Sequence, residues 1–335
     1  MNLFQISKKV FSRCMVIKLT LLLILSLTGV SCVDNSDIHP YPLANDSIHQ
    51  NDSNSLRFFV LSDWGYSGST DQRSVAAQMS QISKLVGIRF ILTCGDNFQV
   101  AGVESVNDPL WNANYETVYN DSALQIPWYP ALGNHDYYGK PEAQVEYSQT
   151  SKYWKMPARH YSFVEKIDNK NSVRFIVLDT QGLINDYQSL EDTTKYESLI
   201  EYVWLKNLLS VSKEKWTIVT SHHPVFSAST GHGDTYEMKM LIKPLFDQYK
   251  VDFYICGHDH NFEHARDKEE YTDYIVTGTG GSVRPAGSNN RTIYSMSTLG
   301  FSYFSLTGST LKLYFITSDG RIGYSFKKIN KWLIG

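Results

Sequence analysis

The chain has little cysteine, and its few cysteines are not spaced as a disulfide framework. Only four occur in 335 residues, too few to hold a domain of this size together. Cys14 and Cys32 lie in or next to the N-terminal segment described below. Cys94 and Cys256 each end an apolar run and precede a glycine, so we expect both to be buried at strand ends. A bridge between these two stays open, but two free thiols that behave as small apolar residues are favoured.

Positive charge is also scarce. The formal net charge is −3, from 31 Lys and Arg against 34 Asp and Glu. The first 31 residues hold four basic and no acidic residues, so the remainder has 27 basic against 34 acidic residues, or −7. Such a balance gives no electrostatic footprint for nucleic acid, although a local basic patch is compatible with it. We expect no nucleic-acid partner.

The N-terminal apolar run, Leu19–Leu27, is short for a membrane span. It follows a basic stretch and precedes the small residues Gly29 and Ser31, which is the pattern of an export signal. Together with Cys32, these residues resemble a bacterial lipoprotein cleavage site, at which Cys32 would carry a lipid anchor to the membrane. Lipid anchoring is favoured, and plain secretion to the periplasm or medium and an uncleaved anchor stay open.

Composition divides the chain into three segments. We expect residues 1–31 to be the signal and residues 32–56, rich in Asn, Asp and Ser, to be a flexible tether. Residues 57–331 show no break in composition and no repeat of solenoid length, so we expect a single domain there. A chain with 42% hydrophobic and 13% aromatic residues has ample material for its core. We expect a monomer.

Apolar runs followed by a polar tip recur along this domain, as in LRFFVLSDWG, FILTCGDN and FYICGHDH. Runs of this length bounded by Gly and Pro are typical of strands buried on both faces. Helical patterns separate the earlier strands, whereas the segments after residue 270 are all β. We therefore expect an α/β (α+β) fold with two mixed sheets packed face to face and helices outside. The expected strands are 57–62, 89–94, 127–132, 160–165, 173–179, 216–221 and 252–256, and the expected helices are 70–86, 111–119, 142–150, 196–212 and 235–249.

Six residues that bind hard or borderline metals follow these strands: Asp63, Asp96, Asn134, His222, His258 and His260. In layered folds the carboxyl ends of such strands meet at one edge, where ligands collect. Carboxylates and imidazoles together suit Fe, Zn or Mn, whereas oxygen ligands alone would indicate Mg or Ca. We predict a site for two metal ions that acts on phosphate esters, because such ions about 3.5 to 4 Å apart activate hydroxide and neutralise phosphoryl charge.

The most specific single motif is Gly257–His260, with the sequence GHDH. Its glycine permits a turn, so that the two histidines can reach different ions. Alone, such a motif is often a surface loop, but the other predicted ligands make that interpretation poor. Two further histidines are expected to have other roles: His223 packs against or orients its neighbour, and His264 is a loop residue.

From about Arg57 to the last strands the chain resembles the calcineurin-like metallophosphoesterases, and among them the small purple acid phosphatases of the tartrate-resistant type. The likeness extends to the segments GDNF, AGV, PWY, GNHD and GHDHN and to the Pro-Val pair after His222. The resemblance implies a four-layer αββα sandwich as the catalytic domain. It also implies that one metal takes Asp63, Asp96 and His260, and the other Asp96, Asn134, His222 and His258.

The resemblance implies substrate contacts as well. His135 matches the family's phosphate-contacting histidine and is a candidate to protonate the leaving alkoxide, with Asp136 holding its ring by a hydrogen bond. His232, flanked by glycines, is a weaker candidate for a second phosphate contact. The relatives carry their histidine slightly later, where this chain has Tyr236.

The chain departs from the family at two positions of the first metal site. The purple enzymes carry a tyrosine three residues after the bridging aspartate, and here that residue is Gln99, which offers only a neutral carbonyl oxygen. The commoner calcineurin-like pattern has a histidine two residues after the first aspartate, and here that residue is Gly65. We therefore expect a colourless enzyme with a weaker first site and a divalent pair such as Fe(II), Zn or Mn. Tyr66 is a weak candidate for a replacement phenol.

We predict a dinuclear-metal phosphatase that hydrolyses small phosphate monoesters by attack of a metal-bound hydroxide. A phosphodiesterase acting on nucleotides or lipid headgroups is the first alternative, since it would use the same ligands. Arg284 is the nearest cation for a monoester's terminal oxygens, although a solvated loop position is the simpler interpretation. The second alternative is a non-catalytic metal- or phosphate-binding protein, which Gln99 favours. Specificity lies in the loops 99–126, 183–195 and 228–236, so the sequence does not name the ester.

Overall fold

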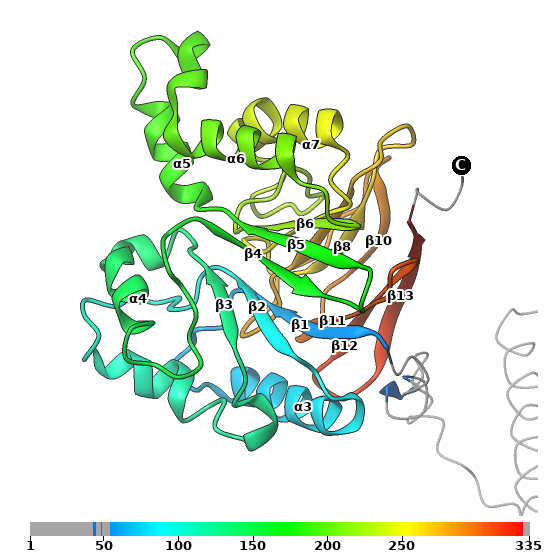
Figure 1. Cartoon of the computed structure of the whole chain (residues 1–335). Helices are drawn as coiled ribbons and strands as arrows, with labels where there is room; N and C mark the ends of the chain where they lie inside the picture. The colour runs from blue at the N-terminus through cyan, green and yellow to red at the C-terminus, as the bar shows by residue number, and fades with distance from the viewer. Residues whose placement is uncertain (1–42, 45–47, 49–53, 331–335) are drawn as a thin grey trace, which may run out of the picture. The chain divides into compact units, whose positions relative to one another are not determined.

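The computed structural model of the chain describes residues 43–44, 48 and 54–330 (Figure 1). The predicted signal and the lipid-anchor candidate Cys32 lie outside these residues. All described residues belong to one compact unit, residues 41–335. Among the described helices, none has the length and the apolar character needed to span a membrane.

The first β-sheet has six strands. In sheet order they are β13 (Ile322–Ile329), β12 (Thr310–Thr317), β11 (Gly300–Leu306), β1 (Leu56–Leu61), β2 (Phe90–Cys94) and β3 (Trp128–Ala131). β1, β2 and β3 run parallel, and β11, β12 and β13 form an antiparallel meander that joins the sheet through β1. The expected change from a βα pattern to antiparallel hairpins is therefore confirmed for this sheet.

The second β-sheet has seven strands. In sheet order they are β10 (Thr292–Met296), β8 (Phe262–Ala265), β9 (Asp273–Thr277), β7 (Phe253–Cys256), β6 (Trp216–Thr220), β5 (Ser172–Val177) and β4 (Tyr161–Lys166). Its centre, from β5 to β9, is parallel, and both of its edges are antiparallel. Both sheets are mixed, as the sequence predicts.

Helices cover the outer faces of the two sheets. They are α3 (Thr70–Val86), α4 (Pro141–Tyr147), α5 (Thr180–Gln188), α6 (Ile200–Val211) and α7 (Lys243–Tyr249). Figure 1 shows α3 against the first sheet and α5, α6 and α7 on the opposite side, beyond the second sheet. The four-layer αββα sandwich is thus confirmed.

The alternation of side chains along the strands builds three separate cores. In β1, Phe58 and Val60 enter the core between the sheets, whereas Phe59 and Leu61 pack in the core under α3. The third core lies between the second sheet and α6 and α7. Each large apolar side chain buried in this way contributes about 1.5 to 3 kcal/mol. Central strands packed on both faces hold the loops at their carboxyl ends rigid.

Several elements differ from the sequence-based expectation. The helix expected at 111–119 is a π-helix, Trp111–Glu116, and the helix expected at 235–249 begins with a π-helical segment, Met238–Ile242, before α7. The helix expected at 196–212 is a 3₁₀ segment, Thr193–Ser198, followed by α6. Helix α5 and the short strands β8 and β10 were not expected. Four- and five-residue strands carry too little periodicity to be recognised.

Part of the predicted tether packs against the domain. Leu43 forms a β-bridge with Arg321, and the Ala44 amide donates to the carbonyl oxygen of Gly320 over 2.8 Å. Ala44 and Ile48 are buried in the core under α3. The expectation of a uniformly flexible tether is therefore wrong for these positions.

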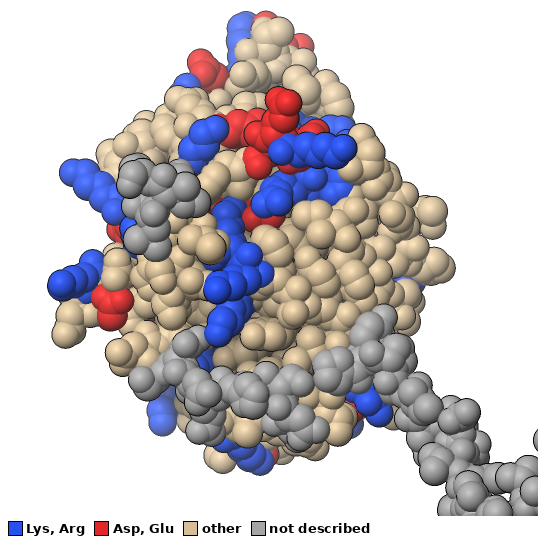
Figure 2. Space-filling view, turned by 90° about the vertical axis from the view of Figure 1, so that its right-hand side faces the viewer, with Lys and Arg blue, Asp and Glu red and all other residues tan. Residues whose placement is uncertain are grey.

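Charged residues are sparse on the face shown in Figure 2, where Lys and Arg form a narrow band with acidic residues beside its upper end. A nucleic-acid surface needs a broad basic stripe or patch. The absence of a nucleic-acid partner stays a prediction that this view supports.

Candidate metal centre

Each of the six predicted metal-binding residues follows the carboxyl end of a strand. Asp63, Asp96 and Asn134 follow β1, β2 and β3, and His222, His258 and His260 follow β6 and β7. The side chains of Asn134 and His258 are half-buried, and the other four are buried. The cluster is thus enclosed on most sides and accessible near Asn134 and His258.

Three of these side chains meet in a tight triangle. Asn134 Oδ1 lies 2.9 Å from His222 Nε2 and 3.0 Å from His258 Nδ1, and these two ring nitrogens are 3.1 Å apart. Asp96 Oδ1 lies 3.5 Å from His222 Nε2. Ligand atoms about 2.1 Å from one ion lie about 3.0 to 3.4 Å from each other. The four side chains therefore have the spacing of ligands to a single metal ion.

The tautomer of His222 makes this arrangement suitable for a cation. Its Nδ1 lies 2.9 Å from the carbonyl oxygen of Cys94, which can only accept, so Nδ1 carries the proton. His222 Nε2 is then unprotonated, so this nitrogen and Asn134 Oδ1 are both hydrogen-bond acceptors that face each other. Two lone pairs at 2.9 Å repel each other unless a proton or a metal ion lies between them. Burial, followed by the neighbouring imidazoles, lowers the pKa of His258 far below its ordinary value, so the His258 ring is neutral as well.

A second group of side chains that could bind a metal ion lies around Asp63. His260 Nε2 is 3.3 Å from Asp63 Oδ1, and ligand atoms of Asp63, Asp96 and His222 all lie within 4.8 Å of one another. Asp63 Oδ1 is buried and accepts no hydrogen bond from the described residues. A buried carboxylate oxygen without a donor is costly unless it binds a cation.

The His260 ring is oriented by a hydroxyl pair. Ser282 Oγ lies 2.5 Å from His260 Nδ1 and 2.7 Å from the Tyr66 hydroxyl. When Nδ1–H donates to Ser282, Nε2 is left with its lone pair directed toward Asp63. The sequence did not single out Ser282, which follows the glycine pair after β9. Tyr66, expected to be a loop residue or a replacement ligand, instead reaches His260 through Ser282.

The backbone at the site is held in uncommon conformations. Asp63, Asp96 and His258 have φ angles of 54°, 49° and 70°, which cost about 1 to 3 kcal/mol each for residues other than glycine. Neighbouring glycines provide space for their side chains. A Cβ atom at Gly257 would lie 2.3 Å from Asp63 Oδ2, and one at Gly133 would lie 2.2 Å from Asp96 Oδ1. Strain of this kind persists where the surrounding structure positions functional groups.

The two aspartates have opposite electrostatic environments. Burial raises the pKa of Asp63, but the nearby His260 outweighs burial and holds that pKa below its ordinary value. Burial, followed by repulsion from Asp63 and Asp136, raises the pKa of Asp96 well above its ordinary value. A cation beside Asp96 would remove this penalty, which is the role expected of a bridging ligand.

Asp136 holds backbone amides and not the ring of His135. Its carboxylate accepts hydrogen bonds from the backbone amides of Gly133 (2.8 Å), Asn97 (3.2 Å) and Phe98 (3.1 Å). The expectation that Asp136 orients the His135 ring is therefore wrong. A fully buried carboxylate needs several donors, and these amides of the two ligand-bearing loops supply them.

His135 lies at the accessible side of the cluster. Its backbone amide donates to Asp96 Oδ1 over 3.0 Å, and its Nε2 lies 4.0 Å from Asp96 Oδ2. The ring packs edge-on against Tyr138, whose side chain is exposed. Burial, followed by the charge of His222, lowers the pKa of His135. The ring is thus close enough to contact a phosphate group held at the cluster.

His232 and Arg284 form a pair at the edge of the cluster. The His232 ring lies 4.0 Å from the ring of His258, and Arg284 Nη1 donates to His232 Nε2 over 2.9 Å. The backbone amide of Arg284 donates to the carbonyl oxygen of His260 over 2.8 Å. Among the described residues Arg284 has no carboxylate partner, so its charge is available to an anion.

Asp259, the residue between the two histidines of the GHDH motif, fixes the loop that carries His232. Its carboxylate accepts hydrogen bonds from the backbone amides of His232 and Gly233, both over 3.1 Å. Tyr236, at the family's histidine position, is 62% exposed. The structure therefore brings His232 to the cluster, and gives Tyr236 no buried contact there.

The remaining predicted residues have clear positions. Gln99 is buried, and its Oε1 has no hydrogen-bond partner among the described residues. His223 is buried, packs edge-on against His222 and bonds Thr180 Oγ1 over 2.9 Å, as expected of a residue that orients its neighbour. His264 lies in β8 and pairs with Asp273 over 2.8 Å, so its assignment to a loop is wrong.

Both buried cysteines are free thiols. Cys94 Sγ lies 3.0 Å from Thr220 Oγ1, and burial raises the pKa of this thiol to about 12. A thiol buried in such surroundings is typical of an inert, structural cysteine. The favoured expectation of two free, buried thiols at strand ends is confirmed.

Comparison with known proteins gives consistent similarities. Residues 56–262 match the family model described as calcineurin-like phosphoesterase. The chain is 32% identical over 289 residues to tartrate-resistant acid phosphatase type 5 of Oryctolagus cuniculus, covering 79% of this chain and 88% of the relative. It is 32% identical over 283 residues to purple acid phosphatase 7 of Arabidopsis thaliana, covering 80% and 84%.

Two solved structures have a similar fold. GAP50, described as the anchor in the inner membrane complex of Plasmodium, superposes with a TM-score of 0.74 at 28% identity, over 83% of this chain and 89% of that one. A purple acid phosphatase from yellow lupin superposes with a TM-score of 0.60 at 17% identity, over 82% and 53% of the two chains. The second likeness bears on the fold alone.

Proposed function

Because the chain belongs to the calcineurin-like phosphoesterase family, we propose that it is a metal-dependent hydrolase of phosphate monoesters with a two-metal centre. The observation that carries this proposal is the convergence of carboxylate, amide and imidazole lone pairs at the ends of five strands. Relatives with more than 30% identity are named acid phosphatases, which supports the same activity.

The donors fit two metal ions that share Asp96. We assign one ion to Asp63, Asp96 and His260, and the other to Asp96, Asn134, His222 and His258. The orphaned Asp63 Oδ1 supports the first assignment, and the acceptor pair of Asn134 and His222 supports the second. The orphaned Oε1 of Gln99 is a further, weaker candidate for the first ion. A mixed carboxylate and imidazole set fits Fe, Zn or Mn.

Bound ions would supply a nucleophile at mild pH and neutralise charge on the phosphoryl oxygens. The chain's own residues do the remaining work. His135, at the accessible side, has a ring nitrogen in position to give a proton to the leaving alkoxide. Asp136 holds the backbone of the two loops that carry Asp96 and Asn134, so it positions ligands without touching the substrate.

Arg284 and His232 favour a monoester over a diester. A monoester carries about two negative charges and exposes three terminal oxygens, whereas a diester carries one charge and exposes two. One N–H group of the Arg284 guanidinium donates to His232, and the other N–H groups are available to such oxygens. Because no described carboxylate neutralises Arg284, it adds positive charge where the extra oxygen of a monoester would lie.

A non-catalytic metal- or phosphate-binding protein is the second candidate. Gln99 favours it, because a neutral amide stabilises a metal ion less than an anionic ligand. The similarity to GAP50, which is described as an anchor, also favours it. His135, Arg284 and all six predicted ligands are present, however, and a binding protein has no use for a proton donor.

Hydrolysis by the purified full chain tests the proposal. The protein is stripped with a chelator, and Fe, Zn or Mn is added back before assay with an aryl phosphate monoester and the matching diester. We expect metal-dependent turnover of the monoester, lost in Asp96→Asn. Turnover of the diester alone supports the phosphodiesterase, and tight metal binding without turnover of either ester supports the binding protein.

We further propose that the chain is exported and acts as a monomer, with a lipid at Cys32 as its membrane anchor. The N-terminal sequence pattern carries the export proposal. Expression with a labelled fatty acid tests the anchor: the label should appear in the wild type and be absent from Cys32→Ser. Label in neither protein would favour plain secretion.

A further inference from the structure

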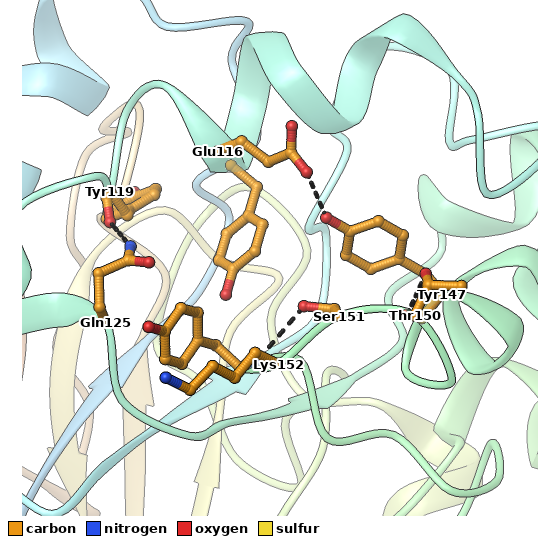
Figure 3. Close-up of a pocket in the computed structure, with 9 residues that line it drawn as sticks. Glu116, Tyr119, Gln125, Tyr147, Thr150, Ser151 and Lys152 are labelled. Atoms are coloured by element: carbon orange, nitrogen blue, oxygen red, sulfur yellow. Dashed lines mark hydrogen bonds between the residues drawn. The ribbon is translucent and has the colours of Figure 1, made fainter.

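We propose that a tyrosine-lined cavity, outside the metal cluster, binds a neutral sugar ring. The cavity has a volume of about 430 Å³ (Figure 3), and its lining residues are Tyr115, Glu116, Tyr119, Gln125, Tyr147, Thr150, Ser151, Lys152 and Tyr153. These residues come from the π-helix, the loop after it and the end of α4 with the loop that follows. None of them belongs to the metal cluster, so this inference does not depend on the proposed hydrolase activity.

The aromatic walls of the cavity are held in place by buried tryptophans. Tyr147 stacks on Trp111, with ring centroids 3.5 Å apart and an interplanar angle of 13°. Trp111 in turn meets Trp154 edge-on at 5.2 Å. Tyr115 packs edge-on against Trp128, also at 5.2 Å. The tyrosine rings are therefore fixed before any ligand arrives, which reduces the entropy lost on binding.

Polar side chains offer both donors and acceptors to this cavity. The Tyr147 hydroxyl donates to Glu116 Oε1 over 2.6 Å, and Gln125 Nε2 donates to the carbonyl oxygen of Tyr119 over 2.8 Å. These bonds orient Glu116 and Gln125 and leave the second carboxylate oxygen and the amide oxygen for a ligand. Figure 3 shows Glu116 and Lys152 on opposite sides of the cavity. Neither forms an ion pair with any described residue, so the Glu116 carboxylate and the Lys152 ammonium group are available to a ligand.

The chemistry of the lining selects the class of ligand. One carboxylate and one ammonium group give no net charge, so the cavity lacks the excess of cations that a phosphate or an acidic peptide needs. Tyr115, Tyr119 and Tyr147 are buried, so the half-buried ring of Tyr153 is the main apolar surface of the lining. The surrounding carboxylate, amide, ammonium and hydroxyl groups can donate hydrogen bonds to hydroxyl groups and accept hydrogen bonds from them. A sugar ring has one C–H face and a rim of hydroxyls, which matches this lining. The volume lies within the range of about 300 to 1,000 Å³ found for small-molecule sites.

The backbone at the cavity gives independent support. Tyr115 and Glu116 end a π-helix, a rare and less favourable turn that occurs frequently at functional sites. The wide turn brings an aromatic ring and a carboxylate to the same cavity.

Saturation-transfer NMR with the full chain tests the proposal. The probes are glucose, galactose, mannose, N-acetylglucosamine, maltose and cellobiose at millimolar concentrations. We expect saturable binding of at least one probe, weakened about tenfold or more in Glu116→Ala. Glu116→Gln keeps an acceptor without the charge and should retain most of the affinity, because the ligand is neutral. Glu146→Ala, an exposed glutamate of α4 outside the lining, should bind like the wild type.

Two results would overturn the proposal. One is the absence of saturable binding for every probe, in protein whose circular dichroism shows a folded chain. The other is binding that Glu116→Ala and Lys152→Ala leave unchanged, since the sugar would then bind elsewhere. Both of these side chains are exposed, so their alanine variants should fold. Unchanged phosphatase turnover in them would show that the cavity and the metal centre act separately.

Discussion

The backbone amide of Gln99 donates a hydrogen bond to the carbonyl oxygen of Gly65 over 3.0 Å. The two positions at which the chain departs from the ligand patterns of related enzymes are thus direct neighbours. A Cβ atom at Gly65 would lie 2.0 Å from the carbonyl oxygen of Asn97, so this backbone has no room for a histidine there. Of these two positions, only Gln99 has a side chain that could add a ligand to the first metal.

Replacing Gln99 with tyrosine should restore colour. In protein reconstituted with iron, we expect no visible phenolate absorption from the wild type and a visible band from Gln99→Tyr, because a phenolate would then reach the first ion. Gln99→Phe is the matched control, since it has the same ring without the hydroxyl. Absorption spectra of the three proteins decide the matter, and equal spectra for the tyrosine and phenylalanine variants would show that position 99 does not contact the metal.

Removing the charge of Arg284 should weaken monoester binding selectively. We expect Arg284→Gln to raise KM for an aryl phosphate about tenfold or more, because charge-assisted hydrogen bonds contribute about 1.5 to 3 kcal/mol. Arg284→Lys keeps the charge and should lose less. Steady-state kinetics on the monoester and the matching diester provide the measurement. A KM increase of equal size for both esters would mean that Arg284 does not discriminate between them.

Ser282 should support the first metal through His260. Loss of its hydroxyl in Ser282→Ala frees the His260 ring to rotate, and we expect metal affinity to fall about 10- to 100-fold. Tyr66→Phe is the control, because it removes the second partner of Ser282 and leaves the bond to His260 intact. Metal titration by calorimetry measures the effect. Unchanged affinity in Ser282→Ala would show that the ring is held by other contacts.

His223 should make the stability of the metal-free protein depend on pH. Burial, followed by the charge of His222, lowers the pKa of His223 well below its ordinary value, so only the unfolded chain takes up a proton as pH falls. Stability from this residue is complete above about pH 6.5 and is lost below it, by about 1.4 kcal/mol per pH unit.

The matched comparison is His223→Gln, which lacks the titrating group. Denaturant unfolding at several pH values gives the free energy of both proteins. The wild type should lose stability relative to the variant below about pH 6.5, and other titrating groups cancel in the difference. Parallel pH profiles would contradict the assignment.

The sequence was sufficient to predict the layered fold and the residues that meet at its strand ends. Long apolar runs identify the buried strands, and the carboxyl ends of parallel strands must meet at one edge, so Asp63, Asp96 and His222 could be brought together without coordinates. Helix α3 was predicted with its observed bounds, and the structure shows that Ser69 caps it.

Other features depend on contacts between distant loops. The Asp136 carboxylate accepts hydrogen bonds from backbone amides. Almost every residue has such an amide, so the sequence does not indicate which ones the carboxylate contacts. Ser282 reaches His260 only because the strand β9 lies beside β7. Helix α5 was missed although Leu183, Ile184 and Tyr187 lie on one buried face and Asp179 caps it, because the helix is short and contains a glycine.

The most direct test of the two-metal account is a metal titration of the stripped full chain, with aryl phosphate hydrolysis followed at each step. If two ions share Asp96 and both are needed, turnover should remain low up to one equivalent of metal and should reach its plateau at two equivalents per chain. A plateau at one equivalent, or two bound ions without turnover, would contradict the proposed two-metal hydrolase.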